Sequence, residues 1–158
     1  GIRDSSVTGV QTCALPILQN QLLSLEMQAL SDRMVDTLVS DLCIGREVDY
    51  PDIFVFDGPL LTGEDQGNWA VYDPEHNSIL IAHDENARNY EEYDKFARSS
   101  VIGDIVTCKP LERTIYLLMH ELAHWMTDFV LRNYSHKHKA NFRLCYAYLR
   151  LRYRSGGF

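Results

Sequence analysis

One helical segment near the middle of the chain limits most strongly what this protein can fold into. Residues 115–131, with the sequence IYLLMHELAHWMTDFVL, are apolar on nearly every side of a helix. A helix that is apolar all round is buried in a protein core. The segment nevertheless contains His120, Glu121 and His124, and a buried carboxylate is unfavourable unless it has a partner or lies near a metal ion. Packing alone therefore does not explain Glu121.

His120, Glu121 and His124 form an HExxH pattern. Positions i and i+4 of a helix lie on one face, so both imidazoles can reach one metal ion. Glu121 would then contact the water on this ion without binding the ion. Zinc metalloproteases have this arrangement, in which zinc lowers the pKa of its water to about 7 and the glutamate accepts the proton. The alternative is a hydrogen-bonded pair of core histidines beside an exposed Glu121.

A catalytic zinc ion needs a third protein ligand, and the carboxylates of the chain do not supply it. No glutamate follows Glu121 in the sequence. Asp128 lies on the same helix face as His120, but about 12 Å further along the axis. We expect at most an indirect role for Asp128.

Two histidines further along the chain, His136 and His138, remain as candidates. If the last helix begins near Lys139, its buried stripe starts at Phe142, and His138 continues that stripe towards the core. His136 falls off the stripe. We therefore predict zinc ligation by His120, His124 and His138, with His136 as the alternative if the turn folds differently.

The chain before the HExxH helix predicts a long helix and a small sheet. Leucine and methionine recur at helical spacing over residues 18–44, and Gly45 is the expected stop. Three short apolar segments are bounded by Gly, Pro, Asp or Asn and predict strands, the last two joined as a hairpin. These strands are expected at residues 52–56, 68–72 and 78–82.

The chain after the strands is mostly helical. Residues 86–99 predict a surface helix or an ordered loop. A long helix is expected from Pro110 to about Asn133, and a last helix from near Lys139 to Tyr153. The predicted fold class is a small α+β, zincin-like domain with a short antiparallel or mixed three-stranded sheet between helices.

The first residues of the chain do not resemble a native protein. Residues 7–17, VTGVQTCALPI, match the translation of a common sequencing adapter residue for residue. We therefore interpret residues 1–17 as a non-native scar, the alternative being a native strand-like segment. Residues 18–158 are expected to form one metallopeptidase domain, and whether native segments are missing at either end stays open.

Cysteine usage and hydropathy indicate an intracellular protein. The three cysteines outside the adapter-like stretch, Cys43, Cys108 and Cys145, form no CxxC pair, which favours a reducing compartment and excludes a cysteine zinc site. No apolar run reaches the length of a membrane span. We expect a cytoplasmic protein without a membrane partner, and the sequence does not predict an oligomeric state.

The charge is divided unevenly along the chain. Residues 1–131 hold 8 Lys plus Arg against 22 Asp plus Glu, whereas seven bases and no acid follow from Arg132 onward. A basic terminal helix could contact DNA. The favoured interpretation is that this helix packs against the acidic body of its own domain or faces solvent.

The histidine pattern resembles that of the SprT-like metallopeptidases, which include the Spartan proteases that digest proteins crosslinked to DNA. That family has HExxH, a spacer, and then HGxxF. Here HELAH is followed by thirteen residues and then HKANF, and the upstream stretch GNWAVYDPEHNSILIA is similar to the family's strand pair. The resemblance covers roughly residues 50–150. It departs from the family pattern at Lys139, where Gly is usual, and in having no cysteine zinc ribbon.

This resemblance implies a zinc-dependent endopeptidase that acts on a protein or peptide. Glu121 would be the general base, and His120, His124 and His138 would hold Zn²⁺. The substrate could lie along a sheet edge, for which SILIA (78–82) is the candidate. Trp125 and Tyr134 could line the cleft, although aromatic residues are more often found in a core.

Two alternatives stay open. The segment KANFRLCYAYL is also similar to a helix of ImmA/IrrE-type zincins, but their third ligand is a glutamate that this chain lacks. The other alternative is a catalytically silent zinc module that binds DNA or protein through its basic last helix. Glu121 argues against that module, because a structural zinc site does not need a general base.

Overall fold

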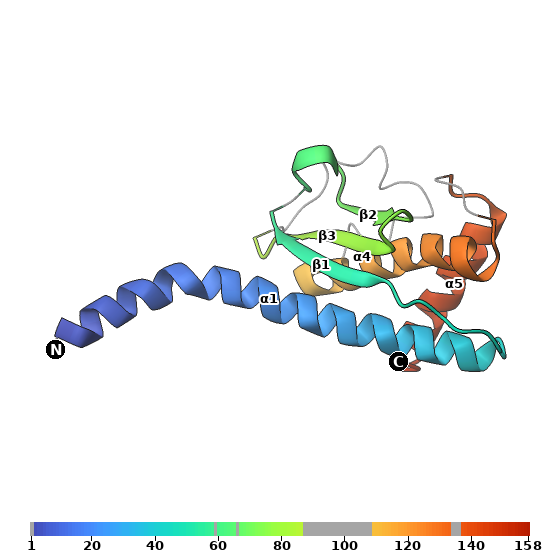
Figure 1. Ribbon diagram of the computed structural model, residues 1–158, viewed down its shortest axis with the longest axis horizontal. Helices are drawn as coiled ribbons and strands as arrows, with labels where there is room; N and C mark the ends of the chain where they lie inside the picture. Colours follow the sequence, from blue (N-terminus) through green and yellow to red (C-terminus); the bar gives the residue numbers. More distant parts are fainter. Residues whose placement is uncertain (1, 59, 66, 87–108, 134–136) are drawn as a thin grey trace.

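The computed structural model describes residues 2–58, 60–65, 67–86, 109–133 and 137–158, and it does not describe the side chains of residues 2–18 and 64. A long helix, a small sheet and two further helices follow one another along the chain (Figure 1), and the α+β fold class is confirmed. The elements are α1 (Ile2–Asp41), β1 (Asp52–Asp57), the 3-10 turn η1 (Gly63–Asp65), β2 (Ala70–Asp73), β3 (Ser78–His83), α4 (Pro110–Trp125), the π-helical turn η3 (Met126–Val130) and α5 (Ala140–Arg154).

The long helix α1 ends at Asp41, whereas the sequence predicted a helix to residue 44. Its backbone begins at Ile2, and its N-terminal half extends beyond the sheet (Figure 1). At the C-terminal end, Cys43 N–H donates to Ser40 O and Ile44 N–H donates to Val39 O, while Cys43 takes a positive φ of 51°. This pattern is a Schellman motif. The prediction that Gly45 stops the helix is therefore wrong.

The sheet is mixed, with the strand order β1-β3-β2. β1 is parallel to β3, and β2 is antiparallel to β3 through the predicted hairpin, in which Asn77 takes a positive φ. SILIA lies in β3 and is therefore the central strand. The prediction that SILIA forms a sheet edge is wrong, because β1 crosses over to pair with it.

Helix α1 covers one edge of this sheet. Ile53 N–H donates to Gln28 Oε1 at 2.8 Å, and Val55 N–H donates to Ser24 Oγ at 3.0 Å. These two amides are the ones that face away from β3, so side chains of α1 take the place of a further strand. Among the described strands, β2 forms the opposite edge of the sheet.

The hydrophobic core lies between the sheet and helices α1, α4 and α5. On β1, Ile53 and Val55 are buried whereas Phe54 and Phe56 are exposed, which shows that the helices cover one face of the sheet. Helix α4 is buried along almost its whole length, as its all-round apolar sequence predicts. Trp125 is fully buried and stacks on Phe129, so it belongs to the core and does not line a cleft.

The α-helical part of the segment after Pro110 is shorter than predicted. α4 ends at Trp125, and a π-helical turn follows in which Leu131 N–H donates to Met126 O. Arg132 then takes a positive φ of 52°, which turns the chain away from the helix axis. The helical segment from Pro110 therefore ends at Val130, and the predicted end near Asn133 is three residues too late. Tyr134 and His136 lie outside the described residues.

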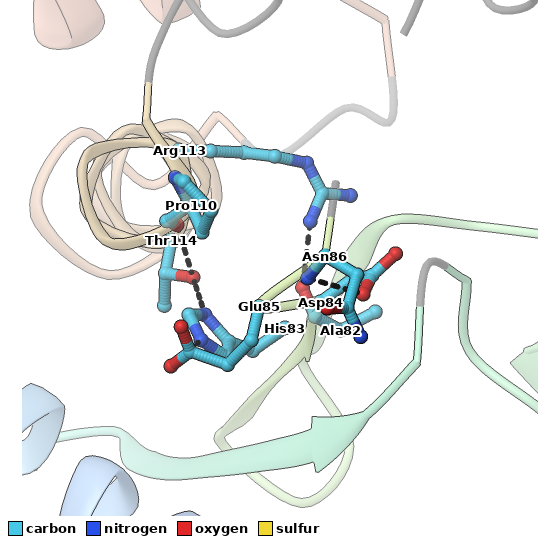
Figure 2. Close-up of polar contacts among 8 residues, drawn as sticks. All are labelled: Ala82, His83, Asp84, Glu85, Asn86, Pro110, Arg113 and Thr114. Atoms are coloured by element: carbon cyan, nitrogen blue, oxygen red, sulfur yellow. Dashed lines mark hydrogen bonds and ion pairs between the residues drawn. The ribbon is translucent and has the colours of Figure 1, made fainter. Parts of the chain in front are cut away.

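A cluster of hydrogen-bonded polar residues joins the end of β3 to the start of α4 (Figure 2). His83 Nδ1 lies 2.6 Å from Thr114 Oγ1, and His83 Nε2 lies 2.9 Å from Glu85 Oε1. Thr114 Oγ1 also donates to Pro110 O at 3.1 Å, and Arg113 donates to Ala82 O at 3.2 Å. These bonds fix the N-terminal turn of the helix that carries the HExxH pattern. Most of the surface element predicted at residues 86–99 lies outside the described residues.

We expect Thr114→Val to destabilise the protein. The substitution keeps the shape of the side chain but leaves the buried Nδ1 of His83 without its partner, which typically costs about 1–3 kcal/mol. Urea denaturation of the two proteins measures the difference in the free energy of unfolding. Thr37→Val is the matched control, because Thr37 Oγ1 makes the same bond to the carbonyl four residues earlier in an exposed place. Equal losses in both variants would contradict the role given to the His83 contact.

The basic last helix is partly neutralised by the rest of the domain. Arg152 lies 3.2 Å from Asp41 of α1, and Arg154 Nε donates to the Tyr116 hydroxyl at 3.2 Å. Tyr148 also donates to Asp41, at 2.7 Å. These contacts support the interpretation that α5 packs against its own domain. Within the described ranges, no helix combines the length and the apolar character needed to cross a membrane.

Candidate metal centre

Three of the predicted site residues come together between α4 and α5. His120 and His124 project from one face of α4, and His138 lies two residues before α5 begins. One ring nitrogen from each histidine lies within 4.8 Å of one ring nitrogen of each of the other two. His138 Nε2 is 3.0 Å from His120 Nε2. His120 and His124 are buried, whereas His138 is exposed, so the group opens towards solvent on one side.

The ring of Phe142 packs against all three histidines. Its centroid lies 4.8 Å from that of His120, 4.3 Å from that of His124 and 4.7 Å from that of His138. Phe142 is buried in the first turn of α5, and the stripe predicted for this helix continues through Cys145, Tyr146 and Leu149. The spacing of four residues from His138 to Phe142 therefore has a physical meaning: it places the loop histidine over the core.

The environment favours the neutral form of His120 and His138. Burial holds the pKa of His120 well below its usual value, and the neighbouring His124 and His138 lower it further. Burial also lowers the pKa of His138, with a smaller contribution from the charge of Arg143. A metal ion binds the neutral imidazole, so a lowered pKa leaves the lone pairs available.

The geometry of the group suits a tetrahedral cation. Two nitrogens bound to one tetrahedral zinc ion lie about 3.4 Å apart, and the separations here, from 3.0 Å to at most 4.8 Å, bracket that value. His120 Nδ1 is buried and has no hydrogen-bond partner among the described residues. When both imidazoles are neutral, His138 Nε2 and His120 Nε2 form a hydrogen bond with each other only if one of these two nitrogens carries the proton of its ring. A shared cation satisfies both lone pairs at once.

Glu121 follows His120 in α4 and is almost fully buried. The residue is 7% exposed, and its carboxylate accepts a hydrogen bond from the backbone N–H of Tyr72. Burial nevertheless raises the pKa of Glu121 from 4.5 to about 8. The alternative of an exposed Glu121 beside two core histidines is therefore wrong.

The buried carboxyl of Glu121 predicts a pH-dependent stability for the metal-free protein. Its folded pKa exceeds its unfolded pKa, so its contribution is fully present below about pH 4.5 and is lost as the pH rises through about 8. Glu121→Gln removes this titration. We expect the unfolding free energy of the variant, measured with urea in the presence of a chelator, to rise relative to the wild type between pH 5 and pH 8. A constant difference over that range would contradict a buried, protonatable Glu121.

Other titratable residues near the site do not join the three histidines. Asp128 is absent from the three-histidine group, and it accepts a hydrogen bond from the Tyr72 hydroxyl at 2.7 Å. Asp73, Glu75 and His76 form a second group that could hold a cation, but this group lies at the surface. The Asp73 carboxylate already has partners within the chain, because it bonds to the His76 ring and accepts a hydrogen bond from the Glu75 backbone N–H.

The described structure therefore defines an α+β protein with a three-histidine group that could bind a metal ion. Comparisons with protein-family models, with curated proteins and with solved structures found no match. The structure brings together the three histidines that the sequence singled out, whereas the sequence did not single out Tyr72. No motif distinguishes this tyrosine from the other eight in the chain.

Proposed function

We propose that this protein is a zinc-dependent metallopeptidase with Glu121 as its general base. One observation carries the proposal: three imidazoles come together in one group, and Glu121, which follows His120 in α4, is a buried carboxylate. A carboxylate buried at this cost is characteristic of a functional site. The resemblance to SprT-like metallopeptidases supports the reaction class and the choice of zinc, since a ligand set of three histidines suits zinc and leaves a fourth position open.

His120, His124 and His138 would hold the metal ion. When bound, zinc supplies a Lewis acid that polarises a substrate carbonyl and lowers the pKa of a water molecule to about 7. Glu121 would accept a proton from the attacking water and donate it to the leaving amine. Burial favours the first transfer, because a raised pKa makes the carboxylate a stronger base.

The peptide would bind along β2. This strand is the sheet edge opposite the one that α1 covers, and its Tyr72 N–H bonds to Glu121. The outward backbone groups of Ala70 would pair with an extended substrate, as in other complexes formed by strand addition. This assignment replaces the predicted edge at residues 78–82, which is the centre of the sheet.

A cleavage assay with zinc-loaded wild type and zinc-loaded Glu121→Gln tests the proposal. An unfolded protein is the suitable first substrate, because it offers extended segments of many sequences. Zinc binding without cleavage dependent on Glu121 would instead support the zinc-containing binding module. A protein that binds no zinc would exclude both functions.

A further inference from the structure

Tyr72 links the sheet to the proposed general base, and its backbone provides the first link. Tyr72 lies opposite Ile79 in β3 and is 4% exposed. Ala82 N–H donates to Trp69 O at 2.8 Å, which places the β2–β3 hydrogen bonds at the odd-numbered residues of β2. The N–H of Tyr72 therefore points away from β3. It donates to the carboxylate of Glu121.

The Tyr72 side chain provides the second link. Its hydroxyl donates to Asp128 Oδ2 at 2.7 Å. Asp128 lies in η3, seven residues after Glu121, which is about two helical turns. β2 is thus attached at two points to the continuous segment formed by α4 and η3, once through its backbone and once through a phenol.

These links matter because β2 is short and lies at the edge. It has four residues, and β3 is its neighbour on one side only among the described strands. A strand held on one side can move away from the helix. The bond to Asp128 limits this motion, and it thereby fixes the N–H that holds the Glu121 carboxylate.

We propose that Tyr72 is a positioning residue, which acts with Asp128 to hold β2 and its N–H against the Glu121 carboxylate. The expected effect on catalysis rests on the proposed peptidase function. The structural part of the proposal is that the Tyr72 hydroxyl, through Asp128, fixes the position of the backbone N–H of residue 72. This part does not depend on peptidase activity and is measured separately.

We expect Tyr72→Phe to lower kcat about 10–100-fold, the usual effect of removing a residue that orients a reacting group. Zinc content should stay the same, because the substitution does not alter any of the three histidines. Asp128→Asn keeps an oxygen that accepts the phenol proton. Its kcat should therefore fall less than that of Asp128→Ala.

Tyr148→Phe is the matched control. Tyr148 also donates to an aspartate oxygen at 2.7 Å, but between α5 and α1. A general loss of stability would affect both tyrosine variants alike, whereas positioning of Glu121 affects only the first. Equal kcat values for the two zinc-loaded variants would overturn the proposal.

Hydrogen exchange at the amide of residue 72 separates this proposal from the proposed function. In wild type this amide should be protected, although it lies on the outward edge of β2. Tyr72→Phe and Asp128→Ala should each speed its exchange at least tenfold, and Tyr148→Phe should not. Unchanged exchange in the first two variants would refute the positioning role even if the protein cleaves peptides. Faster exchange in a protein without Glu121-dependent cleavage would keep the structural role and refute the peptidase.

Discussion

Glu121→Gln is expected to abolish peptide cleavage while zinc stays bound. Glutamine has nearly the same shape as glutamate but cannot accept and return a proton, and general acid–base catalysis typically contributes about 10²- to 10⁴-fold to a rate. The loss should appear in kcat, with KM nearly unchanged, because the histidines and β2 are untouched. Cleavage of an internally quenched peptide, with zinc content measured on the same sample, checks this result.

Glu112→Gln is the control for this experiment. Glu112 lies in the first turn of α4 and is exposed, so the substitution makes the same chemical change in the same helix away from the histidines. Its activity should equal that of the wild type. A zinc-loaded Glu121→Gln protein that cleaves within tenfold of the wild type would remove Glu121 from the mechanism.

His138→Ala is expected to reduce zinc binding drastically. The variant keeps the two histidines of α4 but removes the only one of the three that comes from outside this helix. Loss of a ligand should exceed the roughly 10–100-fold effect typical of residues that merely support a ligand. Metal analysis of purified protein and competition with a chromogenic chelator measure zinc content and affinity.

Two further histidine variants make the result specific. His76→Ala removes a histidine from the surface group with Asp73 and should leave zinc content unchanged. His136→Ala tests the alternative third ligand. If His136→Ala loses zinc and His138→Ala retains it, the ligand set proposed here is wrong.

The basic end of the chain raised the expectation that DNA is a partner. The contacts of Arg152 and Arg154 with the domain weaken the case for DNA, because they occupy part of the charge on α5. The glutamate ligand of ImmA/IrrE-type zincins has no counterpart in the observed group, whose three members are histidines.

Local sequence was sufficient for the parts of this protein that depend on periodicity. Spacings of four residues put His120 and His124 on one face of α4 and connect His138 with Phe142, because a helix repeats every 3.6 residues wherever it lies in a fold. Alternation and turn residues likewise predicted three strands and the β2–β3 hairpin. These features need no knowledge of distant contacts.

Tertiary structure alone decided which strand is central, where α4 changes to a π-helical turn, and what surrounds Glu121. Strand order depends on pairing between β1 and β3, whose residues are far apart in the chain, and a short apolar strand looks the same at the centre and at the edge. The position of Tyr72 between Glu121 and Asp128 follows from that order. Sequence determined which groups could act, and packing determined which of them meet.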